Sequence, residues 1–275
     1  GMAALLPHQS LAFADDGLVE VDGNPSAGTE NRSRVLTSAG GTAIQANDLF
    51  SMKRSETREL LKSHQLLYVY HNQIDNTGDK QATESDTFRA CEVAIEELVR
   101  LVKKLANANV NNVLITADHG FLYQESRLEG QDYLSVKPHG DTLLHVNHRF
   151  ALGHSLKRDP AFITFSSQQL QMAGDIEAQV PASIHRIRTT GSGTRFVHGG
   201  ASLQEVAVPV ITINKGRSSD IYKTPVKIVT ETDKITTGQI TIMLFQQEPV
   251  REKVKARRLV AGLYAGNTLI SDEVT

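Results

Sequence analysis

The sequence of 275 residues carries a net charge of −2, with 40% hydrophobic and 22% charged residues. This is the composition of a soluble globular protein, long enough for one α/β domain with a small appendage or for two modest domains. The sequence has no excess of basic residues, unlike a dedicated duplex-DNA-binding protein. This does not exclude nucleic acid as a substrate. No apolar run approaches the ~20 residues that cross a bilayer, so we expect no membrane partner. Cys91 is the only cysteine, which excludes an intrachain disulfide and favours a cytoplasmic location.

Regular secondary structure is sparse in residues 1–50. This part is rich in glycine, serine, alanine and asparagine, and its one clear element is a short strand at 18–21, closed by a turn signal at 22–25. A helix is predicted at 56–63. Because long loops in a compact domain are often functional, the opening segment is a candidate for a role at a site.

The most regular part of the sequence is a strand, a long helix and a second strand. The runs at 66–70 and 113–115 are continuously apolar, as expected of strands buried on both faces. Between them the pattern predicts a helix over 84–106, capped by Thr83 and Asp86. This order makes a βαβ unit, so the two strands should be parallel. Apolar residues at spacings of three and four should form one face of the helix: Phe88, Cys91, Ile95, Leu98, Val102 and Leu105.

The chain is expected to divide into two domains near residue 215. Segment 216–220 has the polar composition of a linker, and only short β-type runs follow it. We expect 1–214 to form an α/β domain with a mostly parallel sheet flanked by helices. We expect 215–275 to form a small, incomplete, β-rich, sandwich-like module. Further strands of the first domain are predicted at 162–165, 183–187 and 206–213, the last at a sheet edge or strand start because of Pro209.

Three polar clusters lie beside predicted strands. Asp-Asn-Thr-Gly-Asp at 75–79 comes just past the first strand of the βαβ unit, and Asp-His-Gly at 118–120 follows the second. His-Gly-Gly at 198–200 precedes the strand at 206–213. In open α/β sheets, ligands bind outside the carboxyl ends of the strands. The first two clusters should therefore lie near each other.

The side chains of these clusters suit a metal site. Asp75 and Asp79 face the same way if their turn is helical, and two such carboxylates repel unless a cation lies between them. Asp118 and His119 offer an oxygen and a nitrogen ligand from one loop, and the glycines after His198 permit a close approach. Taken singly, each cluster is more often a polar turn, a helix cap or an exposed histidine. Their shared placement beside strands shifts the balance towards a metal site.

Most of the other histidines stand alone and are expected to be structural or exposed. His145 and His148 are three residues apart, and a polar surface pair is favoured over a second metal or phosphate contact. His71 lies on the same strand end as Asp75, so it could line the site.

The three clusters resemble motifs of the alkaline-phosphatase superfamily. Thr-Ala-Asp-His-Gly at 116–120 resembles its T-[AS]-D-H-G element, and 75–79 resembles its D-x-x-G-H element with Asp79 in place of the usual histidine. His-Gly-Gly at 198–200, followed by Leu-Gln-Glu, is similar to its last metal-ligand motif. The opening eight residues and 52–61 narrow the resemblance to the PglZ family of bacterial BREX phage-defence systems, in particular its type A. The similarity covers almost the whole chain.

This resemblance implies a two-zinc site, with Mn²⁺ or Mg²⁺ as alternatives. Asp75, Asp79 and His198 would hold one metal, and Asp118 and His119 would help to hold the other. In the family, the second metal also takes an Asp from the first strand and the nucleophilic Thr or Ser. Both lie upstream of the segment that the 275 residues resemble. We therefore expect this chain to lack the first strand and the nucleophile, and to be inactive alone.

The complete protein is expected to be a metal-dependent phosphohydrolase, either a phosphatase or a phosphodiesterase, that transfers a phosphoryl group at two metals ~4 Å apart. Its substrate would be a phosphate ester, a nucleotide or a nucleic acid, and its partners other proteins of the defence system. A catalytically silent phosphatase-fold scaffold in a multi-protein defence complex is the alternative. A phosphomutase or sulfatase-like enzyme, which shares the fold, is a third class.

Overall fold

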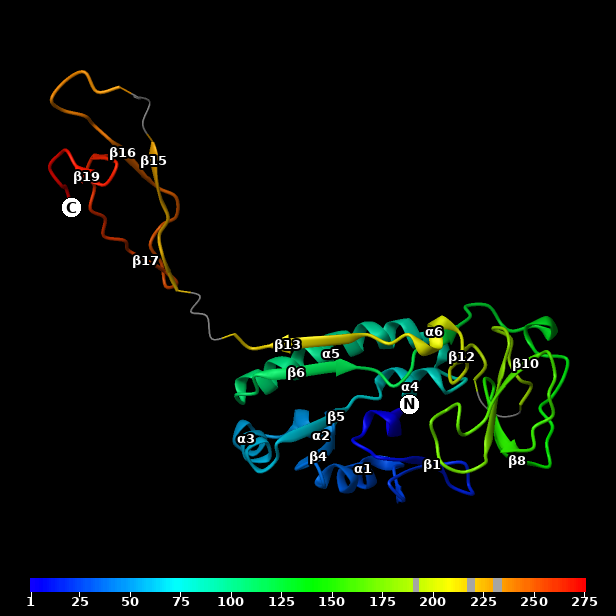
Figure 1. Ribbon diagram of the computed structural model, residues 1–275. Helices are drawn as coiled ribbons and strands as arrows, with labels where there is room; N and C mark the ends of the chain where they lie inside the picture. Colours follow the sequence, from blue (N-terminus) through cyan, green and yellow to red (C-terminus); the bar gives the residue numbers. More distant parts are fainter. Residues whose placement is uncertain (190–192, 217–220, 230–233) are drawn as a thin grey trace. The chain divides into compact units, whose positions relative to one another are not determined.

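The computed structural model divides into two compact units, Gly1–Lys215 and Gly216–Thr275. Most of the predicted linker, residues 217–220, lies outside the residues that the structure describes. No helix within the described ranges is both long and apolar enough to cross a membrane. These ranges are 1–189, 193–216, 221–229 and 234–275 (Figure 1).

The first unit opens with a small antiparallel sheet that packs against a helix. Val21 in the sheet and Leu36 in the helix are fully buried in one apolar cluster, and Leu6 joins them. Burial of these side chains fixes the opening segment onto the body of the unit. The elements are a 3₁₀ turn at Met2–Leu5, β1 (Leu11–Phe13), β2 (Val19–Val21), β3 (Asn24–Pro25) and α1 (Gly28–Thr37).

Two parallel strands follow, with short helices between and after them. β4 (Gly41–Gln45) pairs in parallel with β5 (Leu66–Tyr70). The parallel pairing needs a crossover connection, which two helices supply. The predicted helix at 56–63 is confirmed as part of the second of these. The helices are α2 (Ala46–Ser51), α3 (Arg54–Ser63) and, beyond β5, α4 (Gln73–Gly78).

The long predicted helix is present, but its buried face differs from the expected one. A 3₁₀ turn at Glu84–Asp86 leads into α5 (Thr87–Asn107). Phe88 and Ile95, expected to face the core, are 57% and 63% exposed. The predicted Leu105 is buried and Leu98 packs on the same apolar cluster, whereas the buried positions in the first half of the helix carry small side chains. The buried residues of the helix are Thr87, Ala90, Ala94, Leu101 and Leu105.

The strands on either side of α5 do not pair with each other. β6 (Asn112–Thr116) pairs antiparallel with β13 (Val210–Asn214), whereas β5 pairs with β4. β5 and β6 run in the same direction in Figure 1, and both contribute side chains to the apolar cluster around α5. Among the described strands of the first unit, β4–β5 is the one parallel pair. The structure thus differs from the mostly parallel sheet that the sequence predicts.

The apolar runs of β5 and β6 are also less buried than predicted. Leu66 is 37% exposed and Leu114 is 63% exposed. Each strand belongs to a two-stranded sheet, so one of its edges has no neighbour among the described strands. Burial on both faces, expected from the continuous apolar runs, is therefore wrong for this chain on its own.

A four-stranded antiparallel sheet forms the rest of the first unit, in the order β10-β11-β9-β8. The predicted strand at 183–187 is wrong, because Arg186 makes only a single bridge, with Tyr133. A two-stranded pair joins β7, which precedes this sheet in the chain, to β12, which follows it. The strands are β7 (Leu122–Tyr123), β8 (Thr142–Val146), β9 (Ala151–His154), β10 (Phe162–Phe165), β11 (Glu177–Pro181) and β12 (Phe196–Val197).

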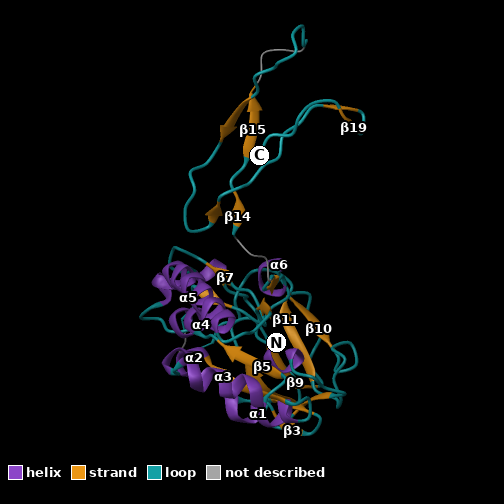
Figure 2. Cartoon of the chain, turned by 90° about the vertical axis from the view of Figure 1, so that its left-hand side faces the viewer, coloured by secondary structure: helices purple, strands orange, loops and turns teal. Residues whose placement is uncertain are grey.

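The described residues of the second unit form three short strand pairs (Figure 2). The last pair is a hairpin around Gly266, whose φ of 62° a two-residue hairpin turn requires. Val254 is the one buried apolar side chain among these residues, so they have little core of their own. The pairs are β14 (Tyr222–Lys223) with β17 (Val254–Lys255), β15 (Val226–Val229) with β16 (Met243–Gln246), and β18 (Tyr264–Ala265) with β19 (Thr268–Leu269).

Candidate metal centre

Asp75 and Asp79 lie one helical turn apart, just beyond the end of β5. The N–H of Asp79 donates a hydrogen bond of 2.9 Å to the carbonyl oxygen of Asp75, which closes the turn at the end of α4. Residues four apart on a helix share a face. The helical turn that would bring both carboxylates to one side is therefore present.

A close contact between Gly78 and Phe196 joins this turn to β12. A Cβ added to Gly78 would lie only 2.5 Å from the Phe196 ring, so only glycine fits here. Phe196 is almost fully buried, and His198 follows it by two residues. The contact thus places the His198 loop beside Asp75 and Asp79.

The loop after β6 carries Asp118 and His119 and is fastened to a distant helix. The N–H of Gly120 donates to the carbonyl oxygen of Glu205 at 2.7 Å. A Cβ added to Gly120 would lie 2.1 Å from the carbonyl oxygen of Gln204. The missing side chain therefore allows the two backbones to meet. This contact connects the Asp118–His119 loop to α6 (Leu203–Val206).

Replacing Gly120 by alanine should lower the free energy of unfolding by about 1–3 kcal/mol, because the new methyl group overlaps a backbone oxygen that cannot move aside. Urea unfolding of the 275-residue protein measures this loss. Gly130→Ala is the matched control, since a Cβ there meets no atom within 4 Å. Equal stability of the two variants would contradict the close approach at Gly120.

The structure brings all five sequence-predicted site residues together from three separate segments. The rings of His119 and His198 stack with their centroids 3.9 Å apart and their planes 4° apart. Nε2 of His119 lies 3.9 Å from Oδ2 of Asp75 and 3.6 Å from Oδ2 of Asp118. Nε2 of His198 lies 3.6 Å from Oδ1 of Asp79. Potential ligand atoms of Asp75, His119 and His198 all lie within 4.8 Å of one another.

This group of side chains fits a metal ion. It combines carboxylate oxygens with imidazole nitrogens, the ligands of zinc sites that keep positions open for substrate. The two imidazoles favour zinc over magnesium, which prefers oxygen ligands. The grouping also differs from the one the resemblance implies, because His119 lies with Asp75 and His198 as well as with Asp118.

Burial and neighbouring charges shift the pKa values of the two central groups. Burial raises the pKa of Asp75, and the nearby His119 and His198 offset only part of this effect. Burial alone would lower the pKa of His198, but the nearby carboxylates of Asp79, Asp75 and Asp118 together outweigh burial, so the pKa is raised. Both shifts favour a bound proton, and a metal cation would take the place of that proton.

A buried ion pair behind the site was not anticipated from the sequence. The side chains of Arg149 and Glu205 are fully buried and form two hydrogen bonds of 2.8 and 2.9 Å. Burial acts to raise the pKa of Glu205, but the bonds from Arg149 and Ser202 outweigh it and lower the pKa. Ser202 with Glu205 three residues later is a capping box at the start of α6. That spacing was visible in the sequence, whereas the Arg149 partner was not.

Two other histidine predictions have different outcomes. His71 does not join the cluster, because its Nε2 lies 2.7 Å from Oε2 of Glu97 on α5. The predicted surface pair of His145 and His148 is wrong, because His148 is 2% exposed and its Nδ1 bonds the carbonyl of Ile187. Burial lowers the pKa of His148, which favours its neutral form.

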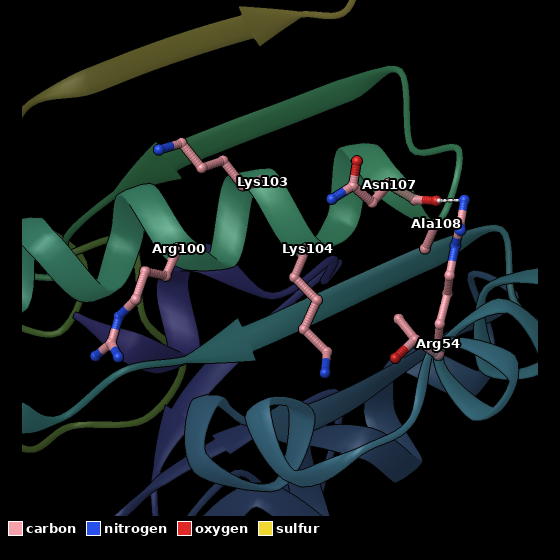
Figure 3. Close-up of a pocket in the computed structure, with 7 residues that line it drawn as sticks. Arg54, Arg100, Lys103, Lys104, Asn107 and Ala108 are labelled. Atoms are coloured by element: carbon pink, nitrogen blue, oxygen red, sulfur yellow. Dashed lines mark hydrogen bonds between the residues drawn. The ribbon is translucent and has the colours of Figure 1, made fainter.

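A cavity of about 360 Å³ beside α5 is lined by four basic side chains, two of which bond backbone carbonyl groups of the fold (Figure 3). Lys104 donates to the carbonyl oxygens of Phe50 and Met52, and Arg54 donates to that of Asn107. Cations near the C-terminal end of a helix stabilise its unpaired carbonyls. None of the five candidate metal ligands lines this cavity.

The chain is similar to proteins of one bacterial defence system. Residues 1–213 match the model of the "BREX system PglZ alkaline phosphatase-like domain". Over 278 residues the chain is 35% identical to the "Alkaline phosphatase-like protein BrxZ" of Escherichia coli O9:H4 (strain HS). It is also 35% identical, over 267 residues, to the "Alkaline phosphatase-like protein PglZ" of Bacillus cereus (strain H3081.97). Each comparison covers 94% of this chain but 31% of the relative, so the chain spans about a third of their length.

The match extends over most of the first unit and includes all three clusters that meet at the candidate site. The chain therefore belongs to the PglZ family of BREX alkaline phosphatase-like proteins.

Proposed function

We propose that this chain supplies the metal-binding part of a phosphohydrolase that acts in defence against phage. The observation that carries the proposal is the convergence of Asp75, His119 and His198, whose ligand atoms lie within 4.8 Å of one another. These residues come from three segments far apart in the chain. A polar turn, a helix cap or an exposed histidine would not require that convergence.

In the proposed site, Asp75, Asp79 and His198 would hold one zinc ion, and Asp118 and His119 would help to hold the second. When bound, two such ions would supply Lewis acidity at the phosphoryl oxygens and lower the pKa of a hydroxyl nucleophile. The protein residues orient these groups and provide fixed charge where the phosphoryl group binds.

We infer from the resemblance that the nucleophile belongs to a part of the complete protein other than these 275 residues. A Cβ built on Gly1 would lie 3.1 Å from Oδ2 of Asp118, so the first residue of the chain lies against the site. The substrate class is a phosphate ester, which includes nucleotides and nucleic acid, and the partners are other proteins of the defence system. The single Cys91 supports a cytoplasmic location.

The test is hydrolysis of 4-nitrophenyl phosphate and bis(4-nitrophenyl) phosphate by the complete protein, after chelation and again with zinc restored. We expect zinc-dependent turnover that falls at least about 100-fold in Asp118→Ala, whereas Asp175→Ala, which changes an exposed carboxylate, retains activity. The 275-residue chain should show no turnover. Zinc-dependent turnover by that chain, abolished in Asp118→Ala, would place the nucleophile within these residues.

A scaffold without catalysis is the second candidate. Large apolar side chains on β6 and β13 are exposed, among them Leu114 and Val210, and exposed apolar surface marks sites where other polypeptide packs. A complete protein that binds zinc but hydrolyses neither ester would favour this role.

A further inference from the structure

The ion pair between Arg149 and Glu205 connects the loops that carry the two stacked histidines. Oε1 of Glu205 accepts the N–H of Gly200 at 2.9 Å, two residues after His198. The backbone oxygen of the same glutamate accepts the N–H of Gly120 at 2.7 Å, one residue after His119. One residue therefore holds both histidine loops, through its side chain and through its backbone.

Arg149 extends this connection to a third part of the fold. Its guanidinium donates to the carbonyl oxygens of Ser183 and His185 as well as to Glu205. The next residue, Phe150, packs against the His198 loop, since a Cβ on Gly199 would lie 2.7 Å from its ring. Arg149 thus anchors Glu205 to the segment beyond the four-stranded sheet.

Stability alone gives a weak reason for such a pair. Replacing a buried ion pair by well-packed apolar residues is often neutral or stabilising, so a buried pair is poor evidence for a purely stabilising role. The geometry offers another reason. The bidentate arrangement fixes the direction of the Glu205 side chain as well as its distance, and Glu205 in turn accepts hydrogen bonds within two residues of both His119 and His198.

We propose that Arg149 and Glu205 are positioning residues that hold the His119 and His198 loops at the separation needed to bind metal. The inference rests on the proposed function for its metal, but the separation of the two rings can be measured without one. Neither residue is assigned a contact with metal or substrate.

The first measurement uses the metal-free 275-residue protein with labelled histidine. The stacked rings, 3.9 Å apart, should give a nuclear Overhauser effect between His119 and His198. Glu205→Gln keeps the shape of the side chain but places an amide nitrogen where Arg149 or Ser202 donates. We expect it to abolish the signal, and Arg149→Met to do the same. Gln179→Leu, which removes another fully buried polar side chain with its own hydrogen bonds, should leave the signal intact.

The second measurement is zinc affinity by competition with a chromophoric chelator. Residues that orient metal ligands without touching the metal typically change its affinity by about 10- to 100-fold, and we expect that loss in Glu205→Gln and Arg149→Met. The double variant Arg149→Met/Glu205→Leu removes both charges. If this double variant regains stability while its zinc affinity stays low, the pair contributes to metal binding independently of its contribution to stability.

The outcomes distinguish this inference from the proposed function. Disappearance of the Overhauser signal between the two rings in both single variants supports the positioning role. Absence of zinc binding by the unaltered protein would refute the metal proposal but not the positioning role. Persistence of that signal in both single variants overturns the positioning role, whatever the zinc affinity. Affinity that recovers together with stability in the double variant would also overturn it.

Discussion

Alanine in place of His198 is expected to weaken zinc binding by the 275-residue protein at least about 100-fold, since removal of a direct ligand should exceed the usual effect of removing a residue that only orients one. The proposed first metal position keeps three protein ligands, Asp75, Asp79 and His198, which is the usual number at a catalytic zinc. The second position keeps only Asp118 and His119. We therefore expect one tight zinc ion, with the second position weak or empty.

His119→Ala is the comparison that tests this assignment, because we expect it to weaken the tight site no more than about tenfold. The structure supplies a specific rival: one zinc ion held by Asp75, His119 and His198, whose ligand atoms are already within 4.8 Å. In that case both histidine variants would lose affinity equally. Calorimetric titration decides between the two, with His154→Ala as control, since His154 lies 3.6 Å from an exposed aspartate outside the cluster. Loss of binding in His119→Ala alone would show the assignment to be wrong.

The local parts of the site could be predicted from the sequence because short spacings determine them. Asp75 and Asp79 share a helical face once their segment forms a turn, and both the turn and the preceding strand are present. His198 is different, because about eighty residues separate it from Asp118 and no spacing rule connects them. It was included because its His-Gly-Gly cluster precedes a predicted strand and because that cluster resembles a family motif, and only the folded chain shows its ring stacked on His119.

Long-range pairing was the part that could not be predicted. The pattern of α5 allowed more than one buried face, and the face with alanines at 90 and 94 packs inward while Phe88 and Ile95 remain exposed. The apolar runs of β5 and β6 indicated strands but not their partners. Arg149 carried no signal at all, because its partner Glu205 lies 56 residues away. In each case the missing information was which surface another element would cover.

Arg149→Met should give the largest loss of stability among the substitutions considered, about 3–5 kcal/mol, because it leaves the carboxylate of Glu205 buried without its partner. Both side chains are fully buried, and the pair makes two direct hydrogen bonds. Arg158→Met is the control: its partner Glu177 is 3.7 Å away, and the arginine side chain is 68% exposed. Such an exposed pair contributes at most about 1 kcal/mol. Urea unfolding of the metal-free protein measures both changes.

The pH dependence of this loss identifies its cause. With Arg149 present, the pKa of Glu205 is lowered in the folded protein, so this residue stabilises the fold above its ordinary pKa of 4.5, and the contribution is lost as the pH falls through the folded value. Without Arg149, burial should raise the folded pKa of Glu205 above that value. The variant then gains relative stability wherever the folded glutamate binds a proton, and loses it as the pH rises through the raised pKa. The deficit of Arg149→Met should therefore be smaller at pH 5 than at pH 8. A deficit that is the same at both pH values would indicate lost packing of the arginine stem, because packing does not depend on the protonation of Glu205.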